Sequence, residues 1–274
     1  MSLSLPLSPQ VFAILSALIE ERMGLHYDVH ERELLAERVS GRATERGFES
    51  LLDYYYFLRY DAAADAELAL LAEALVVNET YFFREVAPLK ILVNEIVPRL
   101  LARGVKPRIW CAACSTGEEP LTLAMLLDEA GLLDQVSLVA SDISARVLAH
   151  ARAGVYRRRS LRSIPPGVIG RWLEGDENGM RVAPHITRAI TFQRVNLVDE
   201  HEPSALGSFD VIICRNVLIY FRDQVIEQVV DRLWQRLRPD GQLVVGTSES
   251  LLRFKVAFAC EEQGGAFFYR KQPK

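Results

Sequence analysis

A loop of small residues between an apolar run and a helix start is the strongest chemical signal in the sequence. It spans residues 109–120, IWCAACSTGEEP. Small side chains let the backbone approach a ligand closely, and a helix N-terminus offers unpaired N–H groups. Dinucleotide-binding folds use such a loop to cradle a pyrophosphate. Here Glu118 and Glu119 would repel phosphate, so they favour a cationic ligand with an amino group and a sulfonium. The alternative is a helix whose first-turn acids serve only its dipole.

Asp142 is the second signal, because it ends an apolar run 25 residues after Gly117. An acid at about this spacing, at the tip of the second strand, binds the ribose hydroxyls of adenosine ligands in related folds. Taken alone, Asp142 is better explained as a cap of the following helix. Its spacing from the loop changes that balance and favours ribose binding.

Further polar residues follow apolar runs that read as strands. The run 209–214 is typical of a central strand in a parallel sheet. Open α/β sheets bind ligands at the carboxyl ends of their strands. The residues expected at those ends are Asn196, Leu197, Arg215, Asn216 and Tyr220. Core packing is the alternative for Tyr220, and it is the preferred interpretation for Phe221.

Asn78, Thr80 and Arg84 interrupt an apolar stretch between two parts of the chain. Such a place is poor for polar groups unless they contact something. Without further context, an interdomain linker is the simpler interpretation.

The predicted secondary structure that positions these residues changes near residue 106, from helices alone to alternating strands and helices. Earlier residues show helical spacing from Ser8-Pro9 to about Gly24, over about 30–46, from Ser50 through the tyrosine-rich stretch, and over 65–76. From residue 106, short apolar runs alternate with helical stretches, which predicts βαβ units and a parallel sheet. The predicted organisation is a helical domain 1–77, a linking segment 78–105 and an α/β domain 106–274 with a β-hairpin insertion at about 157–190.

Composition narrows the function classes. The formal net charge of −4 weighs against a general nucleic-acid binder. No apolar run approaches the roughly 20 residues that a membrane helix needs, and no signal peptide is evident, which predicts a cytoplasmic protein. Cys111 and Cys114 form a CxxC, but no second pair or nearby histidines complete a zinc site. Structural thiols and no metal are therefore expected.

The spaced motifs, taken in order, resemble those of the CheR family, the chemoreceptor glutamate O-methyltransferases. They are NETYFFR at 78–84, STGEEP at 115–120, ASDI at 140–143, ARAGVY at 151–156, NL at 196–197, CRNVLIYF at 214–221 and GTSE at 246–249. The resemblance covers nearly the whole chain. It implies a Rossmann-like α/β methyltransferase domain with a small β-subdomain insertion, preceded by an all-helical N-terminal domain.

The resemblance also implies site residues and a cofactor. S-adenosylmethionine would be bound by Asn78, Thr80, Arg84, Glu119, Asp142, Asn196, Leu197, Arg215 and Asn216, and the product would be S-adenosylhomocysteine. Glu119 is preferred to Glu118 for this role. Arg84 and Tyr220 would stand nearest the methyl group as catalytic residues, Arg84 holding the acceptor carboxylate. A glutamate is ionised at neutral pH, with a pKa of about 4.3, so no general base or metal is needed. Positioning and desolvation would supply the acceleration.

Partner binding is expected at a basic helix face. Arg38, Arg42 and Arg46 recur at i, i+4 and i+8. A solvated face is the default interpretation, but the resemblance implies docking of the acidic methylation helices of chemoreceptors. In some members of the resembled family, the β-subdomain binds a short peptide at the C-terminus of the receptor. The short hairpin turn at 174–179 favours an enzyme that does not need this peptide. A monomer is expected.

Two other functions stay open at this point. One is an RNA or small-molecule methyltransferase of the same fold, which would use Arg157, Arg158 and Arg159 as a phosphate patch. The other is a non-catalytic, cofactor-binding adaptor, against which the intact Arg84 and Tyr220 argue.

Overall fold

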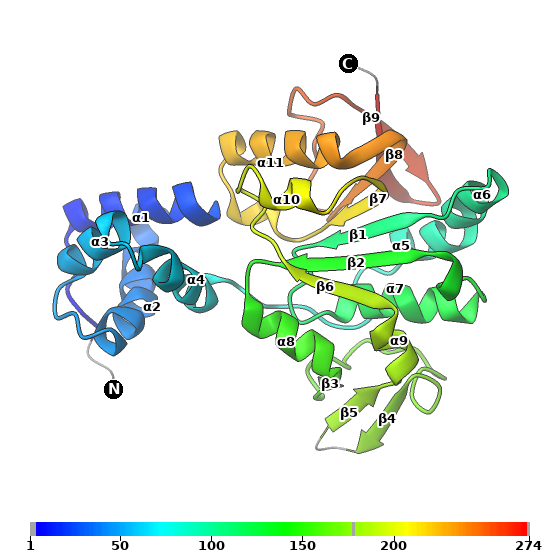
Figure 1. The fold of residues 1–274 in the computed structure, drawn as a ribbon, viewed down its shortest axis with the longest axis horizontal. Coiled ribbons are helices and arrows are strands. Elements are labelled where there is room, and N and C mark those ends of the chain that lie inside the picture. Colours follow the sequence, from blue (N-terminus) through cyan, green and yellow to red (C-terminus); the bar gives the residue numbers. More distant parts are fainter. Residues whose placement is uncertain (1–3, 177–178, 273–274) are drawn as a thin grey trace. The chain divides into compact units, whose positions relative to one another are not determined.

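A computed structural model describes residues 4–176 and 179–272 as two compact units (Figure 1). One unit holds the chain up to Val77 together with Tyr220–Ile226. The other holds Asn78–Ile219 and the chain from Glu227 onward. The hairpin turn predicted at 174–179 includes residues 177 and 178, which lie outside the described residues.

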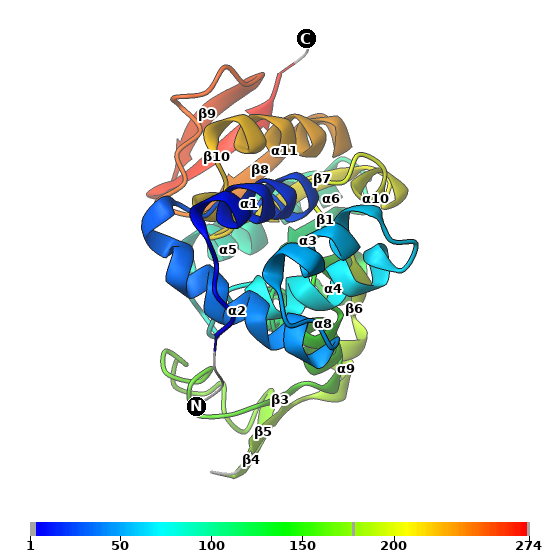
Figure 2. The ribbon, with the colours of Figure 1, turned by 90° about the vertical axis from the view of Figure 1, so that its left-hand side faces the viewer.

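The N-terminal unit is built from helices (Figure 2). They are α1 (Pro9–Met23), the 3-10 turn η1 (Val29–Glu31), α2 (Arg32–Glu45), α3 (Leu51–Tyr60) and α4 (Ala64–Leu75). The Ser8 hydroxyl accepts a hydrogen bond from the Val11 amide, and Gly24 ends α1 in a left-handed conformation. The four predicted helices are confirmed. The second differs at its start, because Asp28 and Glu31 form a capping box that opens a 3-10 turn first.

A seven-stranded sheet forms the second unit, in the order β6-β2-β1-β7-β8-β10-β9. Its strands are β1 (Arg108–Ala112), β2 (Ser137–Asp142), β6 (Ile190–Arg194), β7 (Phe209–Cys214), β8 (Leu237–Val245), β9 (Phe258–Gln263) and β10 (Ala266–Lys271). The first five are parallel neighbours, which confirms the predicted parallel sheet. The antiparallel strands β9 and β10 extend the sheet beyond β8 and were not predicted. The edge strand β9, in which the second half is Glu261-Glu262-Gln263, lacks the apolar run that marks a buried strand.

The order of the strands reverses beside β1. From β1 the chain proceeds to β2 and β6 on one side, and then returns to β7 and β8 on the other side. In open α/β sheets, ligands bind outside the carboxyl ends of the strands at such a reversal. The loops after β1 and β7 are therefore the expected borders of a ligand site.

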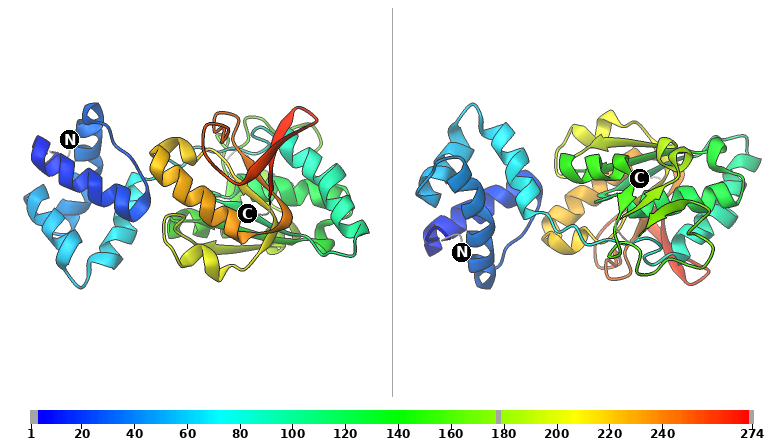
Figure 3. Two further views of the ribbon diagram at one scale, coloured as in Figure 1. Left: turned by 90° about the horizontal axis from the view of Figure 1, so that it is seen from above. Right: turned by 90° about the horizontal axis from the view of Figure 1, so that it is seen from below.

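Helices connect the strands of the second unit. They are α5 (Ala87–Ile91), the π-helical turn η2 (Leu92–Ile96), α6 (Val97–Ala102), α7 (Glu118–Glu129), η3 (Leu133–Gln135), α8 (Ala145–Ala153), α9 (Pro184–Arg188), α10 (Glu202–Ala205), η4 (Leu218–Tyr220) and α11 (Asp223–Arg236). The greater part of α11 and the insertion lie on opposite sides of the sheet (Figure 3). Among the described residues, no helix combines the length and the apolar character that a bilayer crossing requires.

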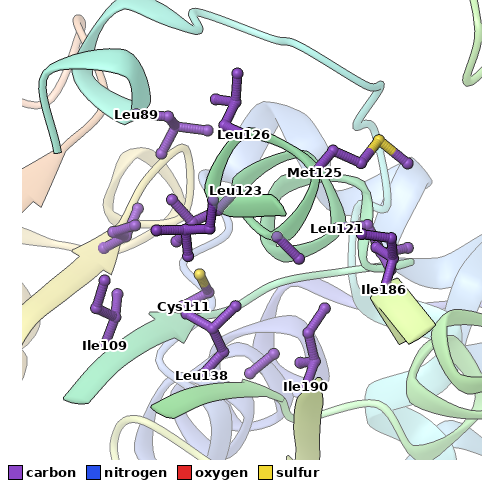
Figure 4. Close-up of a cluster of buried hydrophobic side chains, with 14 of the residues drawn as sticks. Leu89, Ile109, Cys111, Leu121, Leu123, Met125, Leu126, Leu138, Ile186 and Ile190 are labelled. Atoms are coloured by element: carbon purple, nitrogen blue, oxygen red, sulfur yellow. The ribbon is translucent and has the colours of Figure 1, made fainter. Parts of the chain in front are cut away.

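The core of this unit forms where α7 packs on the sheet (Figure 4). Leu121 and Leu123 of α7 are fully buried, as are Ile109 and Cys111 of β1. Each such aliphatic side chain contributes roughly 1.5–3 kcal/mol on burial. The packing fixes the start of α7, and with it the loop that precedes the helix.

The insertion is a three-stranded antiparallel sheet. Its strands are β3 (Val155–Tyr156), β4 (Leu173–Asp176) and β5 (Gly179–Val182), in the order β3-β5-β4. The predicted β-subdomain is thus confirmed, with β3 starting slightly earlier than the predicted insertion.

Gly117, at the start of α7, has a backbone conformation and surroundings that leave little room for a side chain. Its φ is +93°, and a Cβ there would lie 2.6 Å from Cβ of Ala151 on α8. We predict that Gly117→Ala lowers the free energy of unfolding by roughly 2–4 kcal/mol, because strain and overpacking add. Urea denaturation measures this. The control is Gly104→Ala, with φ +74° and nothing within 4 Å of the added Cβ, where strain alone costs about 1 kcal/mol. Equal losses in the two variants would contradict the packing argument.

Candidate functional site

The carboxyl ends of the parallel strands bring most of the predicted site residues to one edge of the sheet. Asp142 ends β2, and its carbonyl accepts a 3.0 Å hydrogen bond from the amide of Val195, the residue before Asn196. Arg215 and Asn216 follow β7 directly. The strands point the same way in Figure 1, so these loops lie along a common edge. The structure thus groups residues from three separate motifs in the second unit.

Asp142 holds the loop that follows β1. Its Oδ2 accepts a 2.8 Å hydrogen bond from the Ser115 amide, and its Oδ1 accepts a 3.0 Å bond from the Ser144 amide. The side chain that caps α8 is Ser144, whose hydroxyl accepts from the Val147 amide. The cap interpretation therefore applies to Ser144. Asp142 instead joins β2 to the loop of small residues, which is where a ribose-binding acid is expected.

The two adjacent glutamates at the start of α7 have different surroundings. Glu118 is 1% exposed, and its carboxylate accepts hydrogen bonds of 2.7 Å from the hydroxyls of Thr116 and Ser160. Glu119 points elsewhere and forms an ion pair of 2.9 Å with Arg215. Glu118 is thereby occupied within the fold, which supports the preference for Glu119 as a ligand-binding residue.

Arg215 is the buried cation of the site. Its side chain is 1% exposed and pairs with Glu119 at 2.9 Å and with Glu85 at 3.0 Å. It also donates to the backbone carbonyls of Arg84 and Glu85 at 3.3 and 3.2 Å. Its Nε is buried without a hydrogen-bond partner among the described residues. Buried donors are nearly always paired in native proteins, so this atom points to a ligand that accepts a hydrogen bond.

The pKa values of the two paired glutamates shift in opposite directions. Burial raises the pKa of Glu119, with Arg215 opposing and the carboxylates of Glu249 and Glu85 adding to the rise. Burial also favours a higher pKa for Glu85. The hydrogen bond and the charge of Arg215 outweigh burial, so the pKa of Glu85 is lowered. Two carboxylates thus share one buried guanidinium, and the charge of Glu249 acts on Glu119 as well. A positively charged ligand beside Glu119 would reduce their mutual repulsion.

The segment 78–84 belongs to the second unit and contacts the loop of small residues between β1 and α7, which we call the cofactor loop. The Phe83 amide donates to the Thr122 hydroxyl of α7 at 3.1 Å, and the Asn78 side chain lies 3.5 Å from the Ser115 hydroxyl. Arg84 is partly exposed, and its Nη1 donates to the Glu79 carbonyl at 2.9 Å. Thr80 is half-buried. The segment is therefore fixed against α7, so it is more than the interdomain linker considered above.

Backbone strain concentrates in the same segments. Among the described residues, six non-glycine residues have a positive φ, and five of them lie around the site: Phe83, Glu85, Ala113, Ser115 and Asn216. Such conformations cost about 1 kcal/mol or more each and cluster at functional sites. Ala113 and Ser115, which stand where related folds carry glycine, are held in the left-handed region that a glycine would favour.

Glu249 is a positioning residue that the sequence reasoning did not assign. Its carboxylate accepts hydrogen bonds from four backbone amides, at 2.6 Å from Asn216, 2.7 Å from Leu218, 3.3 Å from Ile219 and 2.8 Å from Gly246. It thereby holds the turn after β7 in the conformation that presents Arg215 and Asn216. The signal in the sequence was the GTSE motif, which contains a charged residue without an assigned role.

Tyr220 groups with the N-terminal unit. It ends η4, its side chain is half-buried, and its carbonyl accepts a 2.9 Å hydrogen bond from the His26 amide. Its predicted closeness to the methyl group and to Arg84 stays a prediction.

The predicted docking arginines are largely engaged within the N-terminal unit. Arg42 forms a bidentate contact of 2.9 Å with Glu67, which is 3% exposed, and also pairs with Glu45. Arg38 donates to the Leu75 carbonyl at 2.7 Å. Arg46 stacks on Phe57, with its guanidinium 5.3 Å from the ring centroid. These contacts give the arginines structural roles, and docking by this face stays a prediction.

The paired cysteines lie at the end of β1 and in the loop that follows it. Cys111 and Cys114 are free, buried thiols, and burial raises the pKa of each. Buried thiols with raised pKa are inert as nucleophiles at neutral pH. In the part of the chain that the structure describes, no group of three or more His, Cys, Asp or Glu residues is arranged around a metal site.

The arrangement fits S-adenosylmethionine. The cofactor carries a ribose, an amino acid group and a positive sulfur. Asp142 stands where an acid takes ribose hydroxyls, the carboxylate-rich edge suits a cation, and the buried Nε of Arg215 is a donor without a partner among the described residues. The sheet order and this edge together define a methyltransferase of the S-adenosylmethionine-dependent class.

Comparison with known families agrees and is more specific. Residues 78–266 match the model of "CheR methyltransferase, SAM binding domain", and residues 10–76 match "CheR methyltransferase, all-alpha domain". The chain belongs to the CheR methyltransferase family. It is therefore an enzyme that binds S-adenosylmethionine and transfers methyl groups.

Related proteins carry names from chemotaxis. "Chemotaxis protein methyltransferase 2" of Vibrio cholerae is 33% identical over 87% of this chain and 84% of its own length. "Chemotaxis protein methyltransferase" of Vibrio parahaemolyticus is 34% identical over 90% of this chain and 92% of its own length. The protein of the same name from Klebsiella aerogenes is 35% identical over 91% and 86%.

Glu249 provides a test of the site's organisation. We predict that Glu249→Gln lowers the affinity for S-adenosylhomocysteine about tenfold. The glutamine side chain accepts fewer hydrogen bonds than a carboxylate, and its own N–H groups face the four backbone N–H groups. Isothermal titration calorimetry measures this affinity. Glu262→Gln, at an exposed position of β9, is the control. An unchanged affinity in a folded Glu249→Gln protein would show that the turn keeps its conformation without the carboxylate.

Arg42 provides a test of the N-terminal unit. We predict that Arg42→Glu destabilises this unit by about 3–5 kcal/mol, because it leaves the buried Glu67 facing a second carboxylate. Arg46→Glu, at a more exposed side chain with a 3.9 Å contact to Glu67, should cost less than about 1 kcal/mol. Thermal unfolding followed by circular dichroism compares the two. If both variants melt together, the Arg42–Glu67 pair does not have the structural role described.

Proposed function

We propose that this enzyme methylates glutamate side chains of chemoreceptor proteins, forming glutamyl methyl esters. The names of its relatives support a role in chemotaxis. The observation that carries the choice of acceptor is the arrangement around Arg84. This guanidinium is partly exposed, with its side chain 28% accessible, at the end of a segment bonded to the cofactor loop.

Arg84 is well suited to hold a carboxylate. Its Nη1 donates to the Glu79 carbonyl at 2.9 Å. The carboxylate of Glu85 lies 3.8 Å from its Nε and is itself engaged by Arg215. A planar guanidinium binds carboxylates through two parallel hydrogen bonds, which fixes their orientation. Under this proposal, Arg84 directs one oxygen of the acceptor glutamate toward the methyl group.

The chemistry asks little else of the protein. When bound, S-adenosylmethionine supplies a methyl group on a positively charged sulfur. The acceptor glutamate is ionised at neutral pH, so the chain does not need to remove a proton. The side chains of Arg84, Glu119 and Arg215 would hold both reactants, and the apolar walls around β1 and β7 would limit access of water. Tyr220 would orient the acceptor or the donor.

The direct test is the chemical stability of the product. The purified chain is incubated with S-adenosylmethionine tritiated on the methyl group and chemoreceptor-containing membranes of its own organism. We expect label on the receptor that mild base releases as methanol, since esters hydrolyse and methylated nitrogen does not. Label that stays on protein after base, or that appears on RNA, would replace this proposal with another acceptor.

Arg84 is tested in the same assay. We predict that Arg84→Ala lowers kcat/KM for the receptor at least a hundredfold, because both the acceptor clamp and a contact to the cofactor are lost. Arg84→Lys should recover only part of the loss, since an ammonium cannot make the bidentate contact. Full activity in Arg84→Ala would rule out this residue as the clamp.

A further inference from the structure

Arg157, Arg158 and Arg159 form the most concentrated positive charge in the sequence, and their side chains are exposed. They lie between β3 and the remaining insertion, in a turn closed by backbone hydrogen bonds from Ser160 to Arg157 and from Leu161 to Arg158. None of the three guanidinium groups forms a hydrogen bond or an ion pair with another described residue. We call these three residues the arginine run.

The arginine run differs from the basic face predicted on α2. There, Arg42 is engaged by buried Glu67, Arg38 by a backbone carbonyl and Arg46 by an aromatic ring. In the arginine run the charges have no such partners. Three adjacent exposed cations create a local positive potential, which a bound anionic group would neutralise.

The arginine run is anchored to the active site at both of its ends. On one side, the Tyr156 hydroxyl donates to the Thr116 carbonyl of the cofactor loop at 2.6 Å. On the other side, Ser160 donates to the buried Glu118 at 2.7 Å, and its carbonyl accepts from the Phe82 amide at 3.0 Å. The run is therefore held beside the cofactor loop and the segment that carries Arg84.

A neighbouring arginine extends this link. Arg162 pairs with Glu79 at 3.2 Å, and its guanidinium lies 4.0 Å from the centroid of the Tyr81 ring. Arg84 lies over the same ring at 5.9 Å. A short chain of contacts thus leads from the exposed run to the residue proposed to hold the acceptor carboxylate.

The charge balance at the site explains what the run contributes. The protein has a formal net charge of −4, and the site edge holds Glu85, Glu119, Asp142 and Glu249. An acceptor segment that carries carboxylates is repelled by these groups as it approaches. Exposed cations beside a binding site raise the local concentration of anionic ligands and speed their association.

We propose that the arginine run is a docking surface for the acidic protein segment that carries the acceptor glutamate. This inference rests on the proposed function, since it supplies the approach of the same substrate. The partner is a glutamate-rich polypeptide, with side chains that flank the acceptor paired to Arg157, Arg158 and Arg159. The run acts on association and leaves the chemical step unchanged.

The test compares two variants with the same change in charge. One is Arg157→Glu/Arg158→Glu/Arg159→Glu. The control is Arg99→Glu/Arg103→Glu/Lys106→Glu, three exposed residues that precede β1, at the end of that strand away from the cofactor loop. Methylation of a purified cytoplasmic chemoreceptor fragment is measured at 50 mM and 500 mM NaCl, and S-adenosylhomocysteine binding is measured by calorimetry.

We expect the run variant to lose at least about tenfold in kcat/KM at 50 mM salt, through KM, and to approach the wild type at 500 mM salt, where charges are screened. Its kcat and its affinity for S-adenosylhomocysteine should stay within twofold of the wild type. The control variant should lose less than threefold. Equal losses in the two variants, or a loss confined to kcat, would overturn the proposal. Arg157→Ala/Arg158→Ala/Arg159→Ala replaces the run variant if the latter fails to fold.

Binding of polymers separates this inference from the proposed function. Fluorescent poly-L-glutamate should bind the wild type and the control variant with similar affinity. It should bind the variant of the arginine run at least tenfold more weakly. That result supports the docking surface even if no receptor is methylated, in which case the proposed function alone fails. Polyuridylate is the RNA probe. If it binds more tightly than poly-L-glutamate and its binding depends on the arginine run, the proposal is overturned in favour of an RNA-binding surface.

Discussion

The guanidinium of Arg215 lies fully buried at the reversal of the sheet, between Glu119 on α7 and Glu85 at the end of the Arg84 segment. A buried charge is tolerated only when partners surround it, so this residue fixes the positions of both glutamates and of two backbone carbonyls. The loop after β1, the turn after β7 and the segment before α5 are thereby joined. Removing the cation would leave the carboxylates of Glu85 and Glu119 without their shared partner at low dielectric.

Around this centre, further carboxylates hold the loops of the site in place. Asp142 accepts from the Ser115 amide of the cofactor loop, Glu249 accepts from amides of the turn after β7, and Glu118 accepts from the hydroxyls of Thr116 and Ser160. Asp142 and Glu249 thereby satisfy backbone amides at the strained residues Ser115 and Asn216. Glu119 lies beside the buried guanidinium of Arg215, and its pKa is raised. A positively charged ligand would balance the negative charge of Glu119.

The sequence predicted the architecture better than it predicted the roles of individual residues. Apolar runs such as that of β7 are buried in full, so their signal was clear, whereas the edge strand β9 gave none. The two adjacent glutamates were distinguished only by resemblance, since their directions depend on where Ser160 and Arg215 lie in the fold. The engagement of Arg42 could not be read from helical spacing either, because its partner Glu67 comes from another helix.

The two anchors on either side of the arginine run divide the insertion into a fixed base and a hairpin beyond it. Tyr156 and Ser160 are tied to the cofactor loop, while β4 and β5 pair with each other and with β3. Changes of length or sequence in the hairpin can therefore accumulate without altering the geometry of the loop. Within a protein family, this allows the hairpin to acquire or lose partners of its own while the chemistry beneath it is conserved.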